Sequence, residues 1–79
     1  MAKRRGPPPP PPAARPLAQR IRQLRHAKRW SQEELAHRAH IHRVYLAGIE
    51  LAQRNPSLRN LENIARALGV SLVHLFQAD

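Results

Sequence analysis

Cysteine is absent from this sequence of 79 residues, and aromatic residues are scarce, with one Trp, one Tyr and one Phe. Without cysteine the chain has neither disulfides nor Cys-ligated zinc. With so few aromatic residues, a hydrophobic core has to come from packed aliphatic side chains. The length leaves room for one small domain and disfavours an enzyme with a deep pocket.

Long apolar runs are also missing. None approaches the roughly 18 residues that a helix needs to span a bilayer, and residues 1–6 lead into prolines rather than into an apolar signal region. Acidic residues are few, since five of them stand against fourteen Lys and Arg and leave a formal charge of +9. This charge attracts polyanions or anionic membranes without distinguishing between them. We expect a soluble intracellular protein with no membrane partner.

Residues 1–16 hold seven of the eight prolines and four of the basic residues, with almost nothing to bury. We predict that this tail is extended and disordered. It is either a basic arm that reaches along DNA or, as the preferred alternative, a dispensable leader. Residues 17–79 keep ten basic and five acidic residues, or +5, and form the predicted folded domain.

Helical spacing of apolar residues begins at Leu17 and continues through Ile21 and Leu24, which predicts the first helix. A second helix is predicted to start at Gln32 and to end near Ala39. Its start is marked by a capping box. In this motif the Ser31 hydroxyl accepts from the Glu34 amide, and the Glu34 carboxylate reaches back to the Ser31 amide. Trp30 and Leu35 flank the box as a hydrophobic staple.

A third helix is predicted to begin near His42 or Arg43, so close to the second that the two must cross steeply. Ser57 is placed to cap a fourth helix, and Gly69 to end it. Ser71 is placed to cap a last short helix. The sequence therefore predicts an all-α fold of five helices.

Five segments at these spacings carry a resemblance to a known family: Ile21-Arg22-x-Leu24-Arg25, Ser31-Gln32-x-x-Leu35-Ala36, Tyr45-Leu46-x-x-Ile49-Glu50, Arg54-Asn55-Pro56-Ser57-Leu58 and Ile64-Ala65-x-Ala67-Leu68-Gly69-Val70-Ser71-Leu72. The chain resembles the Cro and phage-repressor type of helix-turn-helix, the XRE family. Its segment 42–50 is similar in particular to controller proteins of restriction-modification systems, although phage, plasmid and antitoxin regulators look similar. The resemblance implies a five-helix lambda-repressor-like DNA-binding domain.

The resemblance also implies a function and a set of roles. It points to a sequence-specific transcriptional regulator, such as a repressor, that binds double-stranded DNA with a recognition helix at about 42–51 in the major groove. We expect it in the cytoplasm of a bacterial or phage system, associated with the nucleoid. The expected base contacts are Arg43, Val44, Ala47 and Gly48, and the expected phosphate contacts are Gln32, His42, Gln53, Arg54 and Asn55. Arg25 and Glu50 match a structural ion pair.

A homodimer is expected, because a domain this small makes few DNA contacts alone. The predicted dimer interface lies on the last helix and comprises Leu72, Val73, Leu75 and Phe76. The alternative function is a protein-interaction or antitoxin-type adaptor that uses the same helices.

The chain departs from the family at three positions where glycine is usual, which are occupied by Arg29, His40 and Ala52. These positions commonly require left-handed backbone, so either the loops differ in shape or the domain loses stability there. Gly48 is present where a better helix former is expected. Either the backbone approaches DNA closely at Gly48, or nothing is read there.

Five histidines raise the possibility of a metal site, with His40 and His42 as near neighbours. No Cys accompanies them, and no pair of them has the spacing His-x-x-x-His. His42 is instead predicted to cap the recognition helix or to touch DNA. We predict no metal, no cofactor and no small-molecule ligand, and no pattern of side chains predicts catalysis.

Overall fold

The computed structural model describes residues 11–77, which form five helices and no strand. In chain order the helices are α1 (Ala14–Ala27), α2 (Gln32–Ala39), α3 (Arg43–Glu50), α4 (Leu58–Leu68) and α5 (Leu72–Leu75). The predicted all-α fold is confirmed for this part of the chain. Most of the predicted tail, residues 1–10, lies outside the described residues.

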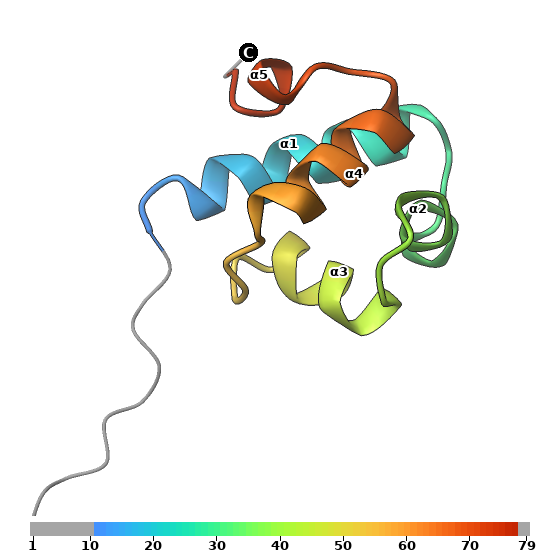
Figure 1. The fold of residues 1–79 in the computed structure, drawn as a ribbon, viewed down its shortest axis with the longest axis horizontal. Coiled ribbons are helices and arrows are strands. Elements are labelled where there is room, and N and C mark those ends of the chain that lie inside the picture. The colour runs from blue at the N-terminus through green and yellow to red at the C-terminus, as the bar shows by residue number, and fades with distance from the viewer. Residues whose placement is uncertain (1–10, 78–79) are drawn as a thin grey trace, which may run out of the picture.

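Helices α2 and α3 follow each other after a short turn and pack against each other. Behind this pair, α4 packs on α2 and α1 packs on α3, while α5 contacts both α1 and α4. In the ribbon, α3 forms the lower edge of the helical body, with no other described element beyond it (Figure 1). The fold therefore supports α3 on one side and leaves its other side open.

The core is aliphatic, as the composition predicts. Its fully buried side chains come from all five helices and include Ile21, Leu35, Leu46, Ile64 and Leu75. Trp30 and Tyr45 are only partly buried and pack against the edge of this core. Full burial of each aliphatic side chain contributes about 1.5 to 3 kcal/mol, so burial supplies most of the stability of this small domain.

The first helix starts at Ala14, three residues earlier than the predicted start at Leu17. The predicted boundary between tail and domain at residue 16 is therefore wrong. Pro16 lies in the first turn of α1, where its missing N–H would have no partner within the helix in any case. Ala14 is buried together with Leu17 and Ala18, which lie on the same face of the helix.

Serine caps begin three of the helices as predicted. The hydroxyl groups of Ser31, Ser57 and Ser71 accept from the backbone amide three residues further on, at 3.0, 3.1 and 3.1 Å. The second half of the capping box is wrong. The Glu34 carboxylate instead accepts from Arg38 Nε at 2.8 Å, because Arg38 lies one turn further on and its guanidinium stacks over the Trp30 ring.

Four helices end in the same way, with a left-handed residue just after the helix. The positive φ angles are 59° at Arg29, 57° at His40, 57° at Ala52 and 73° at Gly69. Each of these amides bonds to the carbonyl three residues back, and the next amide bonds to the carbonyl five residues back. This is the Schellman motif. Of the two alternatives for the three non-glycine positions, a different loop shape is therefore wrong, and the loops keep the left-handed shape that glycine would favour.

No helix within residues 11–77 combines the length and the apolar character needed to cross a membrane.

Candidate nucleic-acid interface

Helix α3 has a buried face and an exposed face. Leu46, Ile49 and Glu50 are at most 2% exposed, while the opposite face carries the four predicted base contacts, Arg43, Val44, Ala47 and Gly48. Arg43 is exposed, Val44 is 60% exposed, and Ala47 and Gly48 are half-buried. Neither a hydrogen bond nor an ion pair engages the Arg43 guanidinium within residues 11–77. Its donors are therefore available to an external acceptor.

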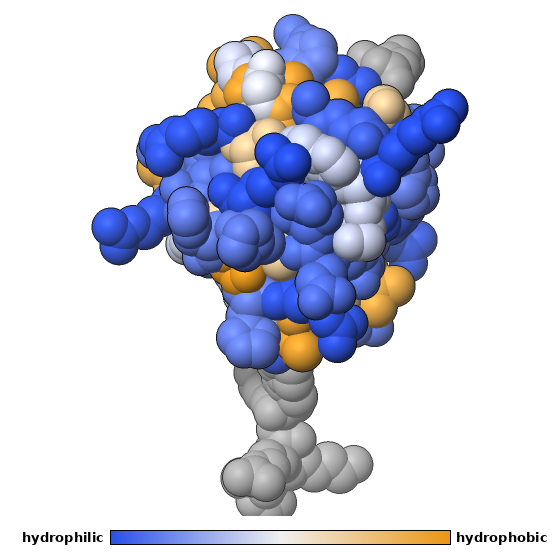
Figure 2. Space-filling model, turned by 90° about the vertical axis from the view of Figure 1, so that its right-hand side faces the viewer, coloured by the Kyte–Doolittle hydropathy of each residue, from blue (hydrophilic) through white to orange (hydrophobic). Residues whose placement is uncertain are grey.

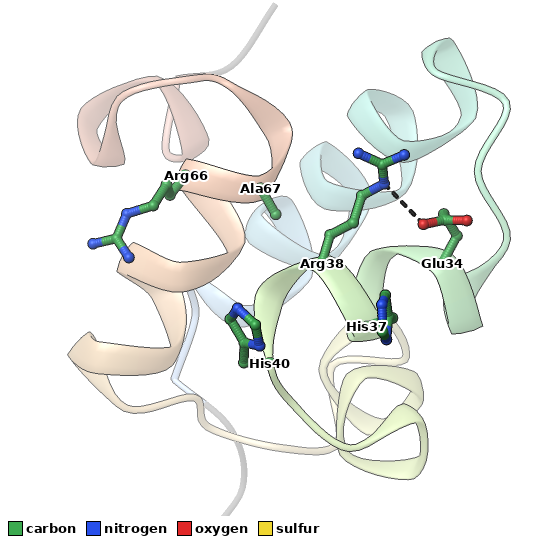
Figure 3. Close-up of a pocket in the computed structure, with 6 residues that line it drawn as sticks. All are labelled: Glu34, His37, Arg38, His40, Arg66 and Ala67. Atoms are coloured by element: carbon green, nitrogen blue, oxygen red, sulfur yellow. Dashed lines mark hydrogen bonds and ion pairs between the residues drawn. The ribbon is translucent and has the colours of Figure 1, made fainter.

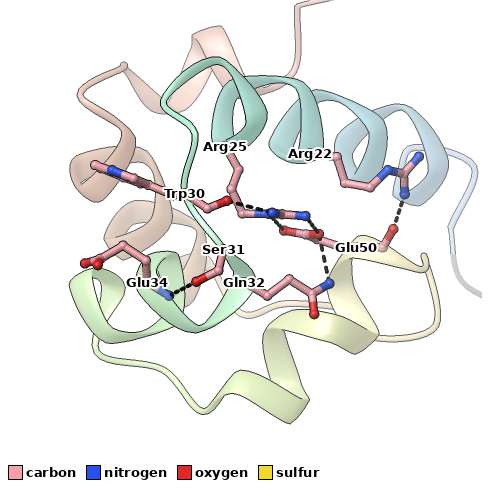
Figure 4. Close-up of polar contacts among 7 residues, drawn as sticks. All are labelled: Arg22, Arg25, Trp30, Ser31, Gln32, Glu34 and Glu50. Atoms are coloured by element: carbon pink, nitrogen blue, oxygen red, sulfur yellow. Dashed lines mark hydrogen bonds and ion pairs between the residues drawn. The ribbon is translucent and has the colours of Figure 1, made fainter.

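A buried ion pair holds α3 to α1. Arg25 Nε and Nη2 donate to the two carboxylate oxygens of Glu50, each at 2.8 Å, in a bidentate arrangement (Figure 4). Arg25 Nη1 donates to the Trp30 carbonyl oxygen at 2.8 Å. Arg22, which belongs to the family segment Ile21-Arg22-x-Leu24-Arg25 but had no predicted role, donates to the Glu50 carbonyl oxygen.

Gln32 joins the same network. Its side-chain amide, predicted to bind phosphate, donates from Nε2 to Glu50 Oε1 at 3.1 Å (Figure 4). The contact arises because the first residue of α2 lies beside the end of α3, and Gln32 is half-buried there. One of its two amide hydrogens is thus engaged within the protein, and the second is left for an external acceptor.

His42 precedes α3 and occupies the N-cap position, but its side chain makes no capping hydrogen bond. The prediction that His42 caps the helix is therefore wrong. Its ring is exposed. The first amides of α3 consequently have no side-chain acceptor from His42, unlike those of α2, where Ser31 supplies one.

The turn after α3 carries the remaining predicted phosphate contacts, and Gln53, Arg54 and Asn55 are all exposed. The side chain of Arg54 lies back over α3. A Cβ atom added at Gly48 would overlap Arg54 Cγ, and the Arg54 guanidinium carbon lies 6.0 Å from the centre of the Tyr45 ring. Gly48 is therefore covered by a side chain of this chain, which disfavours a close approach of its backbone to DNA and leaves the alternative that nothing is read there.

Helix α5 meets only part of its predicted role. Leu75 is completely buried in the core and is not available for a dimer interface, so its assignment there is wrong. Leu72 packs partly against the core, whereas Val73 and Phe76 are 69% and 49% exposed. Arg20 of α1 contacts His74 through its Nη2, 2.6 Å from Nε2 of the imidazole. Helix α5 is thus held to the core by Leu75, and the apolar side chains of Val73 and Phe76 remain exposed.

The surface on the side of α2 is mostly polar. Figure 2 shows the side on which α2 lies, where hydrophilic side chains predominate and apolar ones are exposed only in small areas. A groove on this part of the molecule is lined from α2 and α4, and Arg38 in it is tied to Glu34 (Figure 3). Within residues 11–77 no group of three or more His, Cys, Asp or Glu residues is placed to hold a metal ion.

The steep α2–α3 pair, supported from behind and open on the outer face of α3, is the arrangement of a helix-turn-helix module. Residues 21–75 match the family model described as helix-turn-helix, and the chain belongs to this family. The resemblance on which the sequence analysis relied is confirmed.

The relatives include restriction-modification controller proteins. The control protein C.BamHI of Bacillus amyloliquefaciens is 49% identical over 53 residues, which make up 66% of this chain and 65% of that protein. The chain thus matches just under two thirds of this relative. The controller protein C.AhdI from Aeromonas hydrophila has a TM-score of 0.77 at 42% identity, over 78% of this chain and 94% of that one. The C.Esp1396I tetramer in complex with its natural 35 base-pair operator has a TM-score of 0.76 at 33% identity, over 84% and 87%.

Proposed function

We propose that this protein is a sequence-specific transcriptional regulator that binds double-stranded DNA with α3 in the major groove. The observation that carries the proposal is the exposed face of α3, where Arg43 stands in the first turn without a hydrogen-bond or ion-pair partner within residues 11–77. A basic chain with an open guanidinium at the start of such a helix fits a groove lined by acceptors.

The relatives support the same function at a finer level. C.BamHI is named a control protein, and C.Esp1396I was solved as a tetramer on its natural operator. We therefore propose control of a restriction-modification system as the setting for this chain. Its place of action is then the bacterial cytoplasm, where the operator lies.

Some of these side chains contact DNA bases, and others contact the DNA phosphate backbone. Arg43 pairs bidentately with guanine N7 and O6, and Val44 packs on a thymine methyl group, with Ala47 beside them. Backbone contacts come from the turn after α3, through Gln53, Arg54 and Asn55, together with His42 and the second amide hydrogen of Gln32. Gly48 makes no base contact in this scheme, because Arg54 covers it.

Dimerisation through α5 accompanies DNA binding in the proposal. Val73 and Phe76 supply the apolar contact, with the exposed edge of Leu72. Two copies related by a two-fold axis read half-sites roughly 34 Å apart. Sedimentation at tens of micromolar tests this, and a monomer at that concentration overturns it.

The decisive experiment selects a preferred duplex from a random library and titrates Arg43→Ala on that duplex and on an unrelated one. We expect Arg43→Ala to lose about 1 to 3 kcal/mol on the selected duplex and much less on the unrelated one. Arg66→Ala, which removes the same charge from an exposed position on α4, is the control. Equal losses of affinity on both duplexes would indicate that Arg43 contacts phosphate. A DNA affinity that does not fall as the salt concentration rises would favour the adaptor function.

A further inference from the structure

We propose that Gly48 and Tyr45 form a seat on α3 that holds the Arg54 side chain in place before DNA arrives. Gly48 is thus a positioning residue for Arg54, and not a residue that meets a base. The inference rests on the proposed function, and it also concerns the free protein, where it is tested independently.

The backbone first brings Arg54 back to the helix. After α3 ends, Ala52 turns left-handed with a φ of 57°. The amides of Gln53 and Arg54 then both donate to the Gly48 carbonyl oxygen, at 2.8 and 3.2 Å. One carbonyl near the end of the helix therefore accepts two amides of the turn, and the Arg54 side chain begins over Gly48.

The side chain then follows the helix surface. A Cβ at Gly48 would overlap Arg54 Cγ and would lie 3.4 Å from Nε and 3.5 Å from Cβ of the same arginine. The stem of Arg54 thus occupies the space that any other residue at position 48 would fill. This accounts for a weak helix former within α3, since only glycine leaves the notch open.

Tyr45 completes the seat one turn earlier. Its ring, half-buried against the core, lies 6.0 Å from the guanidinium carbon of Arg54, at the outer limit of a cation–π contact. Within residues 11–77 no hydrogen bond or ion pair engages the Arg54 guanidinium. The Arg54 guanidinium is therefore held near the Tyr45 ring, and its N–H donors remain available to an anionic partner.

The consequence for binding is entropic. An arginine that is already ordered loses less rotamer freedom when it grips DNA, and a long side chain that must be immobilised at an interface reduces affinity about 2- to 10-fold. The stem of Arg54 thus lies over Gly48 near the end of α3, while Arg43 stands in the first turn.

A double-mutant cycle on the selected duplex tests the seat. We expect Gly48→Ala to weaken binding about 2- to 10-fold when Arg54 is present and to have less than about a twofold effect in an Arg54→Ala background. Alanine has the higher helix propensity, which offsets part of the cost of moving the Arg54 stem, and thermal melts of the variants check that the domain stays folded. Equal weakening in both backgrounds means that the new methyl group meets DNA directly, and no weakening means that Arg54 is not positioned by the notch. Either result overturns the proposal.

A second measurement needs no DNA. In the free protein, ring-current shifts from Tyr45 on the Arg54 methylene protons should be resolved by NMR, be lost in Gly48→Ala, and persist in Tyr45→Phe, which keeps the ring. Random-coil shifts for Arg54 in the unchanged protein refute the seat even if DNA binds. Failure of the unchanged protein to bind any duplex refutes the proposed function instead and leaves these shifts as they are.

Discussion

Helices α2 and α3 have the same length of eight residues, yet their ends are stabilised differently. Helix α2 begins with the Ser31 cap, carries Glu33 and Glu34 in its first turn, and has basic residues in its last turn. Helix α3 has no side-chain cap, no acidic residue in its first turn and no basic residue in its last. The local signals that oppose the helix dipole are therefore present in one helix and missing from the other.

The two adjacent helices are therefore stabilised at different places. Helix α2 satisfies its own first turn, whereas α3 depends on burial of Leu46 and Ile49 and on the ion pair of Glu50 with Arg25. Stability obtained from the buried face leaves the exposed face and the first turn available.

The largest expected effect on stability is that of Glu50→Ala at the end of α3. It leaves Arg25 as a buried charge without its carboxylate partner, and we expect a loss of about 3 to 5 kcal/mol in the free energy of unfolding. The matched change in α2 is Glu34→Ala, which removes a half-exposed pair with Arg38 and should cost about 0.5 kcal/mol or less. Urea denaturation measures both. A folded Glu50→Ala protein that no longer binds DNA would contradict the structural role of this residue.

The caps give an intermediate effect. Ser31→Ala should cost about 1 kcal/mol, because the Glu34 amide loses its acceptor. His42→Ala should leave the stability nearly unchanged, since the imidazole makes no capping bond. Thermal melts of the two variants, compared with the unchanged protein, measure the contrast. Similar losses at both positions would show that His42 supports α3 in a way the structure does not contain.

The smallest expected effect lies at the left-handed residues that end the two helices. Ala52→Gly after α3 should raise stability by up to about 1 kcal/mol, because glycine adopts this backbone without strain. His40→Gly after α2 should gain less, since histidine tolerates the left-handed region better than alanine. The control is Ala67→Gly within α4, which should lose stability. A loss at Ala52→Gly, measured by urea denaturation, would contradict the strain assigned to it.

Local rules account for what the sequence predicted well. Serine caps at 31, 57 and 71 depend on a hydroxyl and an amide three residues apart, and the left-handed positions depend on where each helix must stop. Neither feature requires knowledge of distant residues. The start of α1 was predicted too late because the prolines in residues 1–16 indicated a tail, whereas burial of Ala14 stabilises an earlier start of the helix.

Distant contacts account for what the sequence did not reveal. Leu75 was predicted to lie in a dimer interface, but it is buried in the core because α5 packs against α1 and α4. Gln32 was predicted to bind phosphate, but the end of α3 lies beside it and its side-chain amide donates a hydrogen bond to the Glu50 carboxylate. The predicted phosphate and base contacts themselves remain predictions, because a DNA contact belongs to a second molecule.

By itself the sequence determined the helical class and the serine caps, since each of these depends on residues within one or two turns of each other. It also determined the aliphatic core, because the composition offers few aromatic residues. Only the tertiary structure decided that Gly48 lies beneath Arg54 and that Leu75 belongs to the core. Those outcomes depend on how helices far apart in the chain pack together, and local spacing carries no information about that packing.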